Sequence, residues 1–159
     1  MTALATVNGV PTAPDAHGIV QGGSGTDFIS GTGGNDTLQG NGGGDVYFGG
    51  GGSDTFIIKN TDLVNGPSSV NNVAATDVIY DFSGAGAWQA QNNDFIAFEH
   101  FGAGSTLTFD RYGGNPDGSQ NVQLQYYTVH DTTTNGDYTI FIKSLDSSLL
   151  AHGDYNFYL

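Results

Sequence analysis

The sequence predicts an all-β protein in which a short parallel solenoid is followed by an antiparallel, strand-rich cap. A nine-residue unit repeats four times without a break from residue 22 to residue 57. Each unit carries an aspartate at its sixth position and a large apolar residue at its eighth. Repetition at a short fixed period is the signature of a solenoid. After residue 57, short runs of branched and aromatic residues alternate with turn sequences, which is typical of antiparallel sheets.

The chain before the repeats divides into two parts. Residues 1–12 are small and polar, contain proline and show no period, so we expect a flexible lead-in. Residues 13–21 occupy the place of one more unit, with Val20 in the apolar slot but Gly18 where the acid should be. Because terminal repeats of solenoids are usually atypical, residues 13–21 are interpreted as a degenerate capping turn. The solenoid is therefore expected over residues 13–57.

The four units are GGSGTDFIS, GTGGNDTLQ, GNGGGDVYF and GGGGSDTFI, and acid and apolar slots recur in the same phase. Their apolar residues are Ile29, Leu38, Tyr47 and Phe56. If each unit forms one turn and one strand, two units complete one coil. Asp27 then stacks against Asp45, and Asp36 against Asp54. A glycine-rich linker is the alternative interpretation, and the strict phase argues against it.

Glycine-rich turns favour a site for a hard cation. Each glycine loses more backbone entropy on folding than any other residue, so a ligand has to offset that cost. Glycine lets carbonyl oxygens turn inward, and the aspartate adds an anionic oxygen. Calcium takes six to eight such oxygens with tolerant geometry, whereas magnesium demands a stricter octahedron. Stacked carboxylates repel each other without a cation, so metal binding and folding are expected to be one reaction.

The units resemble the G-G-x-G-x-D-x-U-x nonapeptide of the RTX, or hemolysin-type calcium-binding, family. The resemblance implies a right-handed parallel β-roll with at least two calcium ions between successive turns, bound by aspartate side chains and glycine carbonyls. One implied site is Gly23, Gly25 and Asp27 facing Gly40, Gly42 and Asp45. The other is Thr32, Gly34 and Asp36 facing Gly49, Gly51 and Asp54. The units depart from the motif at Thr32 and Asn41, which replace the second glycine, and at the bulky Tyr47.

Residues 58–159 are expected to form the β-rich cap and to share a core with the roll. Alternating patterns predict one hairpin around residues 107–126 and a second closed by Asn135-Gly136, a strong signal for a tight turn. Asp146 is expected to cap a short helix over residues 147–152 before a last strand, residues 155–159. Asp77 and Asp81 are additional candidates for a calcium site where roll meets cap, although turn or surface aspartates are an equal alternative.

The resemblance extends beyond the repeats. DTFII at 54–58, DVIYDF at 77–82 and DFIAF at 94–98 are similar to segments that follow the last repeat in exported RTX proteins. The ending SSLLAHGDYNFYL resembles their C-terminal export region, with Asp154 shortly before three apolar residues, although Tyr155 and Asn156 intervene. Residues 88–93 lengthen the loop before the third segment. The resemblance implies a bacterial protein that a type I secretion apparatus exports to the extracellular space without an N-terminal signal peptide.

Composition excludes several classes of function. Sixteen acidic residues against three basic ones give a net charge of −13, which repels nucleic acid and anionic membranes. Cysteine is absent, so disulfides and thiolate metal sites are excluded. No basic segment followed by an apolar one marks a signal peptide, and no apolar stretch approaches a membrane span of about 18 residues.

Other candidate sites have simpler interpretations. Residues 131–137 begin like an EF-hand loop, but Ile142 stands where its glutamate belongs, which favours a hairpin turn. The histidines show no metal-ligand spacing, and no nucleophile and base lie at a suggestive spacing, so no catalysis is predicted. A polyuronate-binding accessory module of a secreted enzyme is the alternative function. Aromatic residues that might stack on sugars are more typical of a core: Trp88, Tyr112, Tyr126 and Tyr127.

Overall fold

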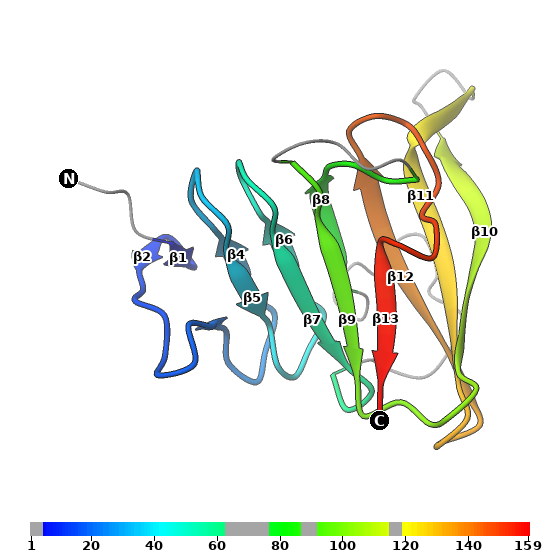
Figure 1. The fold of residues 1–159 in the computed structure, drawn as a ribbon, viewed down its shortest axis with the longest axis horizontal. Helices are drawn as coiled ribbons and strands as arrows, with labels where there is room; N and C mark the ends of the chain where they lie inside the picture. Colours follow the sequence, from blue (N-terminus) through cyan, green and yellow to red (C-terminus); the bar gives the residue numbers. More distant parts are fainter. Residues whose placement is uncertain (1–4, 63–76, 87–91, 115–118) are drawn as a thin grey trace.

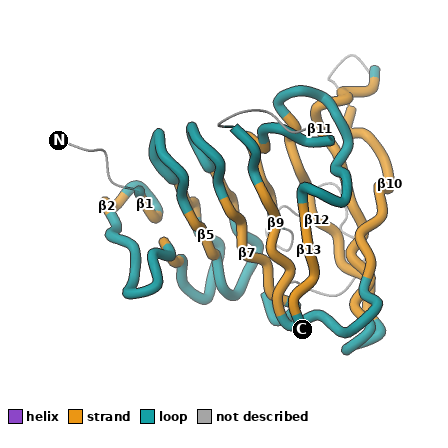
Figure 2. Tube along the Cα trace, in the orientation of Figure 1, coloured by secondary structure: helices purple, strands orange, loops and turns teal. Residues whose placement is uncertain are grey.

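A computed structural model describes residues 5–62, 77–86, 92–114 and 119–159, and in these ranges the chain forms strands, turns and loops with no helix. Two sheets face each other (Figure 1), and strands and loops account for the whole described trace (Figure 2). The strands are β1 (Thr6–Val7), β2 (Val10–Pro11), β3 (Val20–Gln21), β4 (Phe28–Ser30), β5 (Thr37–Gln39), β6 (Val46–Phe48), β7 (Thr55–Lys59), β8 (Val78–Phe82), β9 (Phe95–Glu99), β10 (Thr106–Gly114), β11 (Gln120–Asp131), β12 (Gly136–Ser144) and β13 (Tyr155–Tyr158).

Consecutive repeat units place their strands alternately in the two sheets. The eight-stranded sheet has the order β10-β11-β12-β8-β6-β4-β1-β2, and the five-stranded sheet has the order β13-β9-β7-β5-β3. Strands two units apart pair in parallel, with Ile29 opposite Tyr47 and Leu38 opposite Phe56. All four of these side chains are buried between the sheets. The prediction that two units complete one coil is confirmed.

The N-terminal end of the roll carries two short additions. Val20 of the degenerate unit is buried and pairs with Leu38, so β3 begins the five-stranded sheet. Residues 6–11, within the lead-in expected to be flexible, contain a small antiparallel hairpin that pairs with β4. Asn8 and Gly9 have positive φ angles of 52° and 76°, the left-handed conformation that a tight hairpin turn requires.

Parallel pairing continues beyond the repeats. β8 extends the first sheet beside β6, β9 extends the second beside β7, and β13 lies parallel to β9. Only β10, β11 and β12 form the antiparallel part of the cap, and β12 joins it to the roll by parallel pairing with β8. Both predicted hairpins are present, and Asn135 in the second turn has a φ of 52°. The cap is thus a continuation of the same two sheets.

The predicted helix over residues 147–152 is wrong. Asp146 Oδ1 accepts hydrogen bonds from Ser144 Oγ (2.7 Å) and Ser148 N (3.1 Å), so Asp146 stabilises a turn. The backbone that follows bonds to side chains of β11 instead of to itself. Gln125 Nε2 donates to Ser148 O (2.8 Å), and Leu150 N donates to Tyr127 Oη (2.9 Å). These contacts spread the segment across the inner face of the sheet and leave no helical ladder.

One hydrophobic cluster lies between the sheets and includes side chains from repeats and cap. Tyr47 meets Phe56 edge to face with ring centroids 5.9 Å apart, and Phe56 contacts Phe82 of β8 at 6.2 Å. Farther along, Phe98 of β9 stacks on Phe157 of β13 at 4.8 Å. The repeat turns are therefore positioned by a core that the cap helps to fill.

Candidate metal centre

The first stack of aspartates runs along the ends of β4, β6 and β8. Asp27 N donates to Asp45 Oδ1, and Asp45 N donates to Asp77 Oδ1, each at 2.9 Å. The N-terminal end of this stack is closed by Asn8. Its Nδ2 donates to Asp27 Oδ1 (2.6 Å), while its Oδ1 accepts from Phe28 N (2.9 Å). The side-chain amide of Asn8 therefore takes the place of the backbone N–H that a preceding repeat's aspartate would donate to Asp27.

The second stack runs along the ends of β5, β7 and β9 in the same manner. Asp36 N donates to Asp54 Oδ1, and Asp54 N donates to Asp94 Oδ1, each at 2.9 Å. Asp94 ends this series of contacts, because its second oxygen accepts from Ser83 N at 2.8 Å. The two carboxylate pairs predicted from the sequence are thus adjacent in space, one on each sheet.

Turns eighteen residues apart lie in direct contact, and glycine makes this possible. A Cβ added at Gly43, where φ is +119°, would lie 2.7 Å from the carbonyl carbon of Gly25. A Cβ added at Gly40 would collide with Asp45 Oδ2, and one at Gly49 with Asp54 Oδ2. The glycines therefore hold each aspartate oxygen against the backbone of its own turn.

Three carboxylate oxygens in these stacks are buried without a hydrogen-bond partner: Asp45 Oδ2, Asp54 Oδ2 and Asp77 Oδ2. Burial raises the pKa of Asp45 to about 6 and that of Asp54 to about 7, and neighbouring carboxylates add to both shifts. Burial also raises the pKa of Asp77 well above its usual value. A buried anionic oxygen without a partner is costly, and a proton or a cation removes that cost.

The outer aspartates are better satisfied by their own turns. Asp27 Oδ2 accepts from Gly23 N at 2.5 Å, and Asp36 Oδ2 accepts from Thr32 N at 2.6 Å. In the described ranges, no three acidic or histidine side chains converge on one point. An ion held between these turns must therefore draw most of its ligands from backbone carbonyls. An all-oxygen set of carbonyls and paired carboxylates fits calcium.

Comparison with known families decides what these turns are. Residues 21–56 match the sequence model of the RTX calcium-binding nonapeptide repeat in four copies. These residues are RTX repeats. The match leaves the N-terminal hairpin and the cap outside it, and no curated protein matches the chain. The part of the chain that the structure describes contains no helix long and apolar enough to span a membrane.

The structure places the predicted ligands of each site in neighbouring RTX turns. A Cβ added at Gly42 would lie 3.8 Å from Ser24 Cα, and one at Gly51 would lie 3.7 Å from Gly33 Cα, so third positions face third positions. The turns that carry Gly23, Gly25 and Asp27 thus meet those of Gly40, Gly42 and Asp45. The same holds for the turns of Thr32, Gly34 and Asp36 and those of Gly49, Gly51 and Asp54. Their role as calcium ligands stays a prediction.

The candidates at the junction with the cap separate into two roles. Asp77 continues the first stack, with one oxygen left unpartnered. Asp81 accepts from Gly49 N (2.8 Å) and Gly50 N (3.0 Å), so both its oxygens cap the last RTX turn. Asp94 is not among the site residues predicted from the sequence, although its spacing to Ile96 repeats that of the aspartate and apolar slots. An aspartate two residues before a buried apolar residue is therefore the sequence signal that identifies Asp94.

The remaining candidates have structural roles or lie elsewhere. Asp131 accepts from Gly102 N (3.1 Å) and Thr133 N (2.9 Å); burial opposes its ionisation, but these bonds lower its pKa to about 2. Residues 131–136 close a hairpin, as the sequence predicts. Tyr127 is buried, Tyr112 packs against Phe109, and residue 88 lies outside the described residues. Tyr127 and Tyr112 therefore have the packing roles that the sequence favours.

Proposed function

We propose that the chain is a non-catalytic calcium-binding module that folds when calcium fills its RTX turns. The observation that carries the proposal is the pair of buried oxygens, Asp45 Oδ2 and Asp54 Oδ2, which have no hydrogen-bond partner among the described residues. Two ions, one between the turns of Asp27 and Asp45 and one between those of Asp36 and Asp54, would neutralise both pairs. A net charge of −13 opposes a compact chain, and bound cations reduce that repulsion.

Circular dichroism and calorimetry of the full chain test this proposal. At pH 7.5 we expect strand signal and a cooperative thermal transition in calcium, and an unfolded spectrum in excess chelator. Binding should be half complete at about 0.1–1 mM calcium, the range typical of extracellular calcium modules. Magnesium at the same concentration should not restore the fold. A chain that is equally folded in excess chelator would contradict the proposal.

Export by a type I secretion apparatus is the second part of the proposal. RTX repeats are typical of secreted bacterial proteins. The C-terminal segment that resembles an export signal ends in β13, and Asp154 accepts from Gly86 N and Ala151 N at 2.7 Å each. These contacts fix the segment in the folded protein, so a calcium-poor cytosol, in which the chain is unfolded, would keep it available to the apparatus. Co-expression with a type I apparatus should place the chain in the medium, and deletion of residues 154–159 should retain it in the cell. Equal secretion of both chains would contradict export through this segment.

A polyuronate-binding accessory role is the second candidate function, and one surface feature favours it. Four aromatic side chains cross the solvent face of the larger sheet: Phe48, Tyr80, Phe141 and Tyr126. Successive ring centroids are 5.2, 6.3 and 4.9 Å apart, and the Arg111 guanidinium lies 4.5 Å above the Tyr126 ring. We call this row the aromatic ladder. Aromatic rings stack on sugars, and a guanidinium attracts uronates.

Titration calorimetry with alginate oligomers tests the second candidate. We expect heat that the Tyr80→Ala change removes and that Tyr158→Ala, on an exposed strand of the other sheet, leaves intact. No detectable heat at millimolar oligomer would contradict polyuronate binding and would leave the calcium proposal unaffected.

A further inference from the structure

The two sheets end unequally at the cap. β10 is the edge of the larger sheet and β13 is the edge of the smaller one, and Figure 1 shows both at the same end of the molecule. On β11, the inward side chains Tyr127 and Val129 are 2% and 0% exposed. On β10, inward Leu107 and Phe109 are only half-buried. The smaller sheet therefore stops before it covers the inner face of β10.

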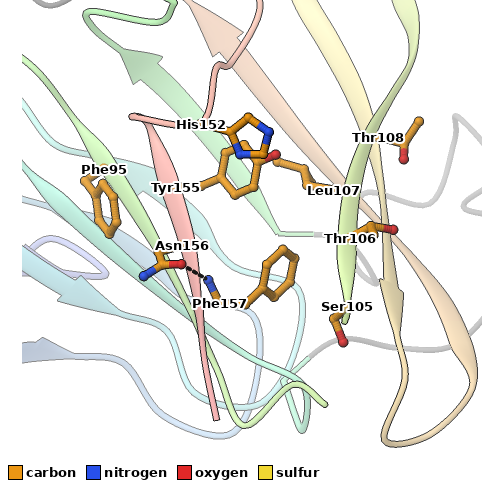
Figure 3. Close-up of a pocket in the computed structure, with 9 residues that line it drawn as sticks. All are labelled: Phe95, Ser105, Thr106, Leu107, Thr108, His152, Tyr155, Asn156 and Phe157. Atoms are coloured by element: carbon orange, nitrogen blue, oxygen red, sulfur yellow. Dashed lines mark hydrogen bonds between the residues drawn. The ribbon is translucent and has the colours of Figure 1, made fainter. Parts of the chain in front are cut away.

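A cavity of about 750 Å³ lies between the two edges. Figure 3 shows Leu107 of β10 and Phe157 of β13 on its two sides, with His152 and Tyr155 at one end. The volume is in the range of ligand-binding pockets. The position is the one that a further strand beside β13 would occupy. We call this cavity the edge groove.

The backbone of β13 offers hydrogen-bonding groups to the edge groove. Ile96 N bonds to Asp154 O and His100 N bonds to Tyr158 O, so alternate residues of β13 face β9. Phe157 N faces the other way. It donates to the side chain of its own neighbour, Asn156 Oδ1, at 3.0 Å (Figure 3). An exposed side chain thus covers this edge donor, and a strand that offers a carbonyl can displace it.

The charge of the edge groove differs from that of the rest of the protein. None of the nine residues that line it is acidic, although the chain carries sixteen acidic residues. The groove wall therefore carries no negative charge that an apolar strand would have to desolvate, while the net charge of −13 disfavours a segment with acidic residues. Its apolar wall, formed by Leu107 and Phe157, suits a strand with apolar side chains at alternate positions, which face one side of a strand.

We propose that the edge groove is a docking site for an extended peptide segment of a partner protein, with alternating apolar residues and no acidic ones. The segment adds to β13 as a sixth strand of the smaller sheet. Its backbone carbonyl replaces Asn156 Oδ1 at Phe157 N, and its apolar side chains cover Leu107. Strand addition of this kind takes affinity from main-chain hydrogen bonds and specificity from alternate side chains.

Nuclear magnetic resonance of the calcium-loaded full chain tests the proposal with the peptide acetyl-KVTVTVK-amide. We expect the amide signals of Phe157 and Leu107 to shift on titration, and hydrogen exchange at Phe157 N to slow. A peptide N-methylated at every valine and threonine should cause neither change, because it lacks the amide donors of a strand. Equal binding of both peptides, or no shift at millimolar peptide, would overturn the proposal.

A matched pair of variants locates the site. Leu107→Asp places a carboxylate in the wall of the edge groove and should weaken binding of the peptide about tenfold. Val122→Asp adds the same charge in place of an apolar side chain on β11 that is 45% exposed and does not line the edge groove, and it should leave binding unchanged. If Leu107→Asp does not fold, the comparison of the unmodified and N-methylated peptides on the unaltered chain still tests the proposal. Shifts at Phe157 on concentrating the protein alone would mean that copies of the chain pair here, which overturns the proposal.

Discussion

At the scale of single residues, the aspartates of the roll divide according to their position. At the start of the first stack, Asp27 has both oxygens hydrogen-bonded, and at the start of the second, Asp36 Oδ2 accepts from both the backbone and the hydroxyl of Thr32. Asp45 and Asp54, which lie between two turns, each keep one oxygen buried and unpartnered. The inner carboxylates therefore gain most from a cation, and substitutions there should respond to calcium differently from substitutions on the surface.

The Asp45→Asn variant tests this difference. The amide keeps the shape and the Oδ1 that accepts from Asp27 N, but it loses the anionic oxygen. We expect the melting temperature in calcium to fall by about 5–10 °C. In excess chelator at pH 4.5, where protonation favours the metal-free fold, it should stay unchanged, because the Asp45 carboxyl is uncharged there, as the amide is. Asp137→Asn, on an exposed carboxylate paired with His130, is the control and should change neither value. Equal losses in both conditions would mean that Asp45 is only structural.

The raised pKa values predict how stability changes with pH. Burial raises the pKa of Asp45 to about 6, of Asp54 to about 7 and of Asp94 to about 6 in the folded state, above their ordinary value. The metal-free fold binds more protons than the unfolded chain, so its stability is greatest near pH 4 and is lost as pH rises through 6 and 7. Circular dichroism in excess chelator from pH 4.5 to pH 7.5 measures this, and the folded fraction should fall as the pH rises.

Calcium should reverse that dependence on pH. The ion competes with protons for the same oxygens, so its affinity rises between pH 5 and 7.5. Calorimetry at several pH values in that window checks the expectation, and the binding heat should change with the ionisation heat of the buffer because protons are released. A calcium affinity independent of pH would contradict protonation of these carboxylates.

At the scale of elements, the repeat could be predicted because its spacing fixes which residues meet. A nine-residue period places Asp27 on Asp45 and Asp36 on Asp54 without any knowledge of the cap. Asn8 could not be found in this way, since it reaches Asp27 from a hairpin outside the period. The predicted helix failed because Gln125 and Tyr127, distant in sequence, bind its backbone. Both the contact of Asn8 and the conformation of residues 147–152 depend on residues distant in the sequence, which the nine-residue period does not determine.

The Gly40→Ala variant tests how closely a repeat turn encloses its aspartate. The added methyl group would collide with Asp45 Oδ2 and lie close to Tyr47 Oη, so the turn has to open. We expect a loss of about 1–3 kcal/mol in the free energy of unfolding in calcium, together with weaker calcium binding. Gly33→Ala is the matched control, because a methyl group there meets nothing within 4 Å. Equal losses of unfolding free energy for Gly40→Ala and Gly33→Ala would mean that the change in backbone entropy, and not the collision with Asp45, causes the effect.

At the scale of the whole molecule, roll and cap are joined by pairing and by packing. β8 lies between the repeat strand β6 and the cap strand β12 in one continuous sheet. Asp77 and Asp94, both from cap segments, end the two aspartate stacks of the roll. The sequence predicts the shared core only in general terms, because the strands that follow the repeats lack the nine-residue period. Calcium binding in the roll and order in the cap are therefore expected to be coupled.

The Phe82→Ala variant tests that coupling from the side of the cap. Phe82 is fully buried, contacts Phe56 of the last repeat and is no candidate ligand. We expect the free energy of unfolding in calcium to fall by about 3–5 kcal/mol. If binding and folding are one reaction, as proposed, the calcium concentration at half-folding should rise as well. Leu159→Ala, which removes a side chain that is 82% exposed, should change both values little. If roll and cap fold as one unit, any loss of packing in the shared core weakens the apparent affinity for calcium. A Phe82→Ala chain that is less stable but has an unchanged calcium midpoint would therefore mean that the roll folds independently of the cap.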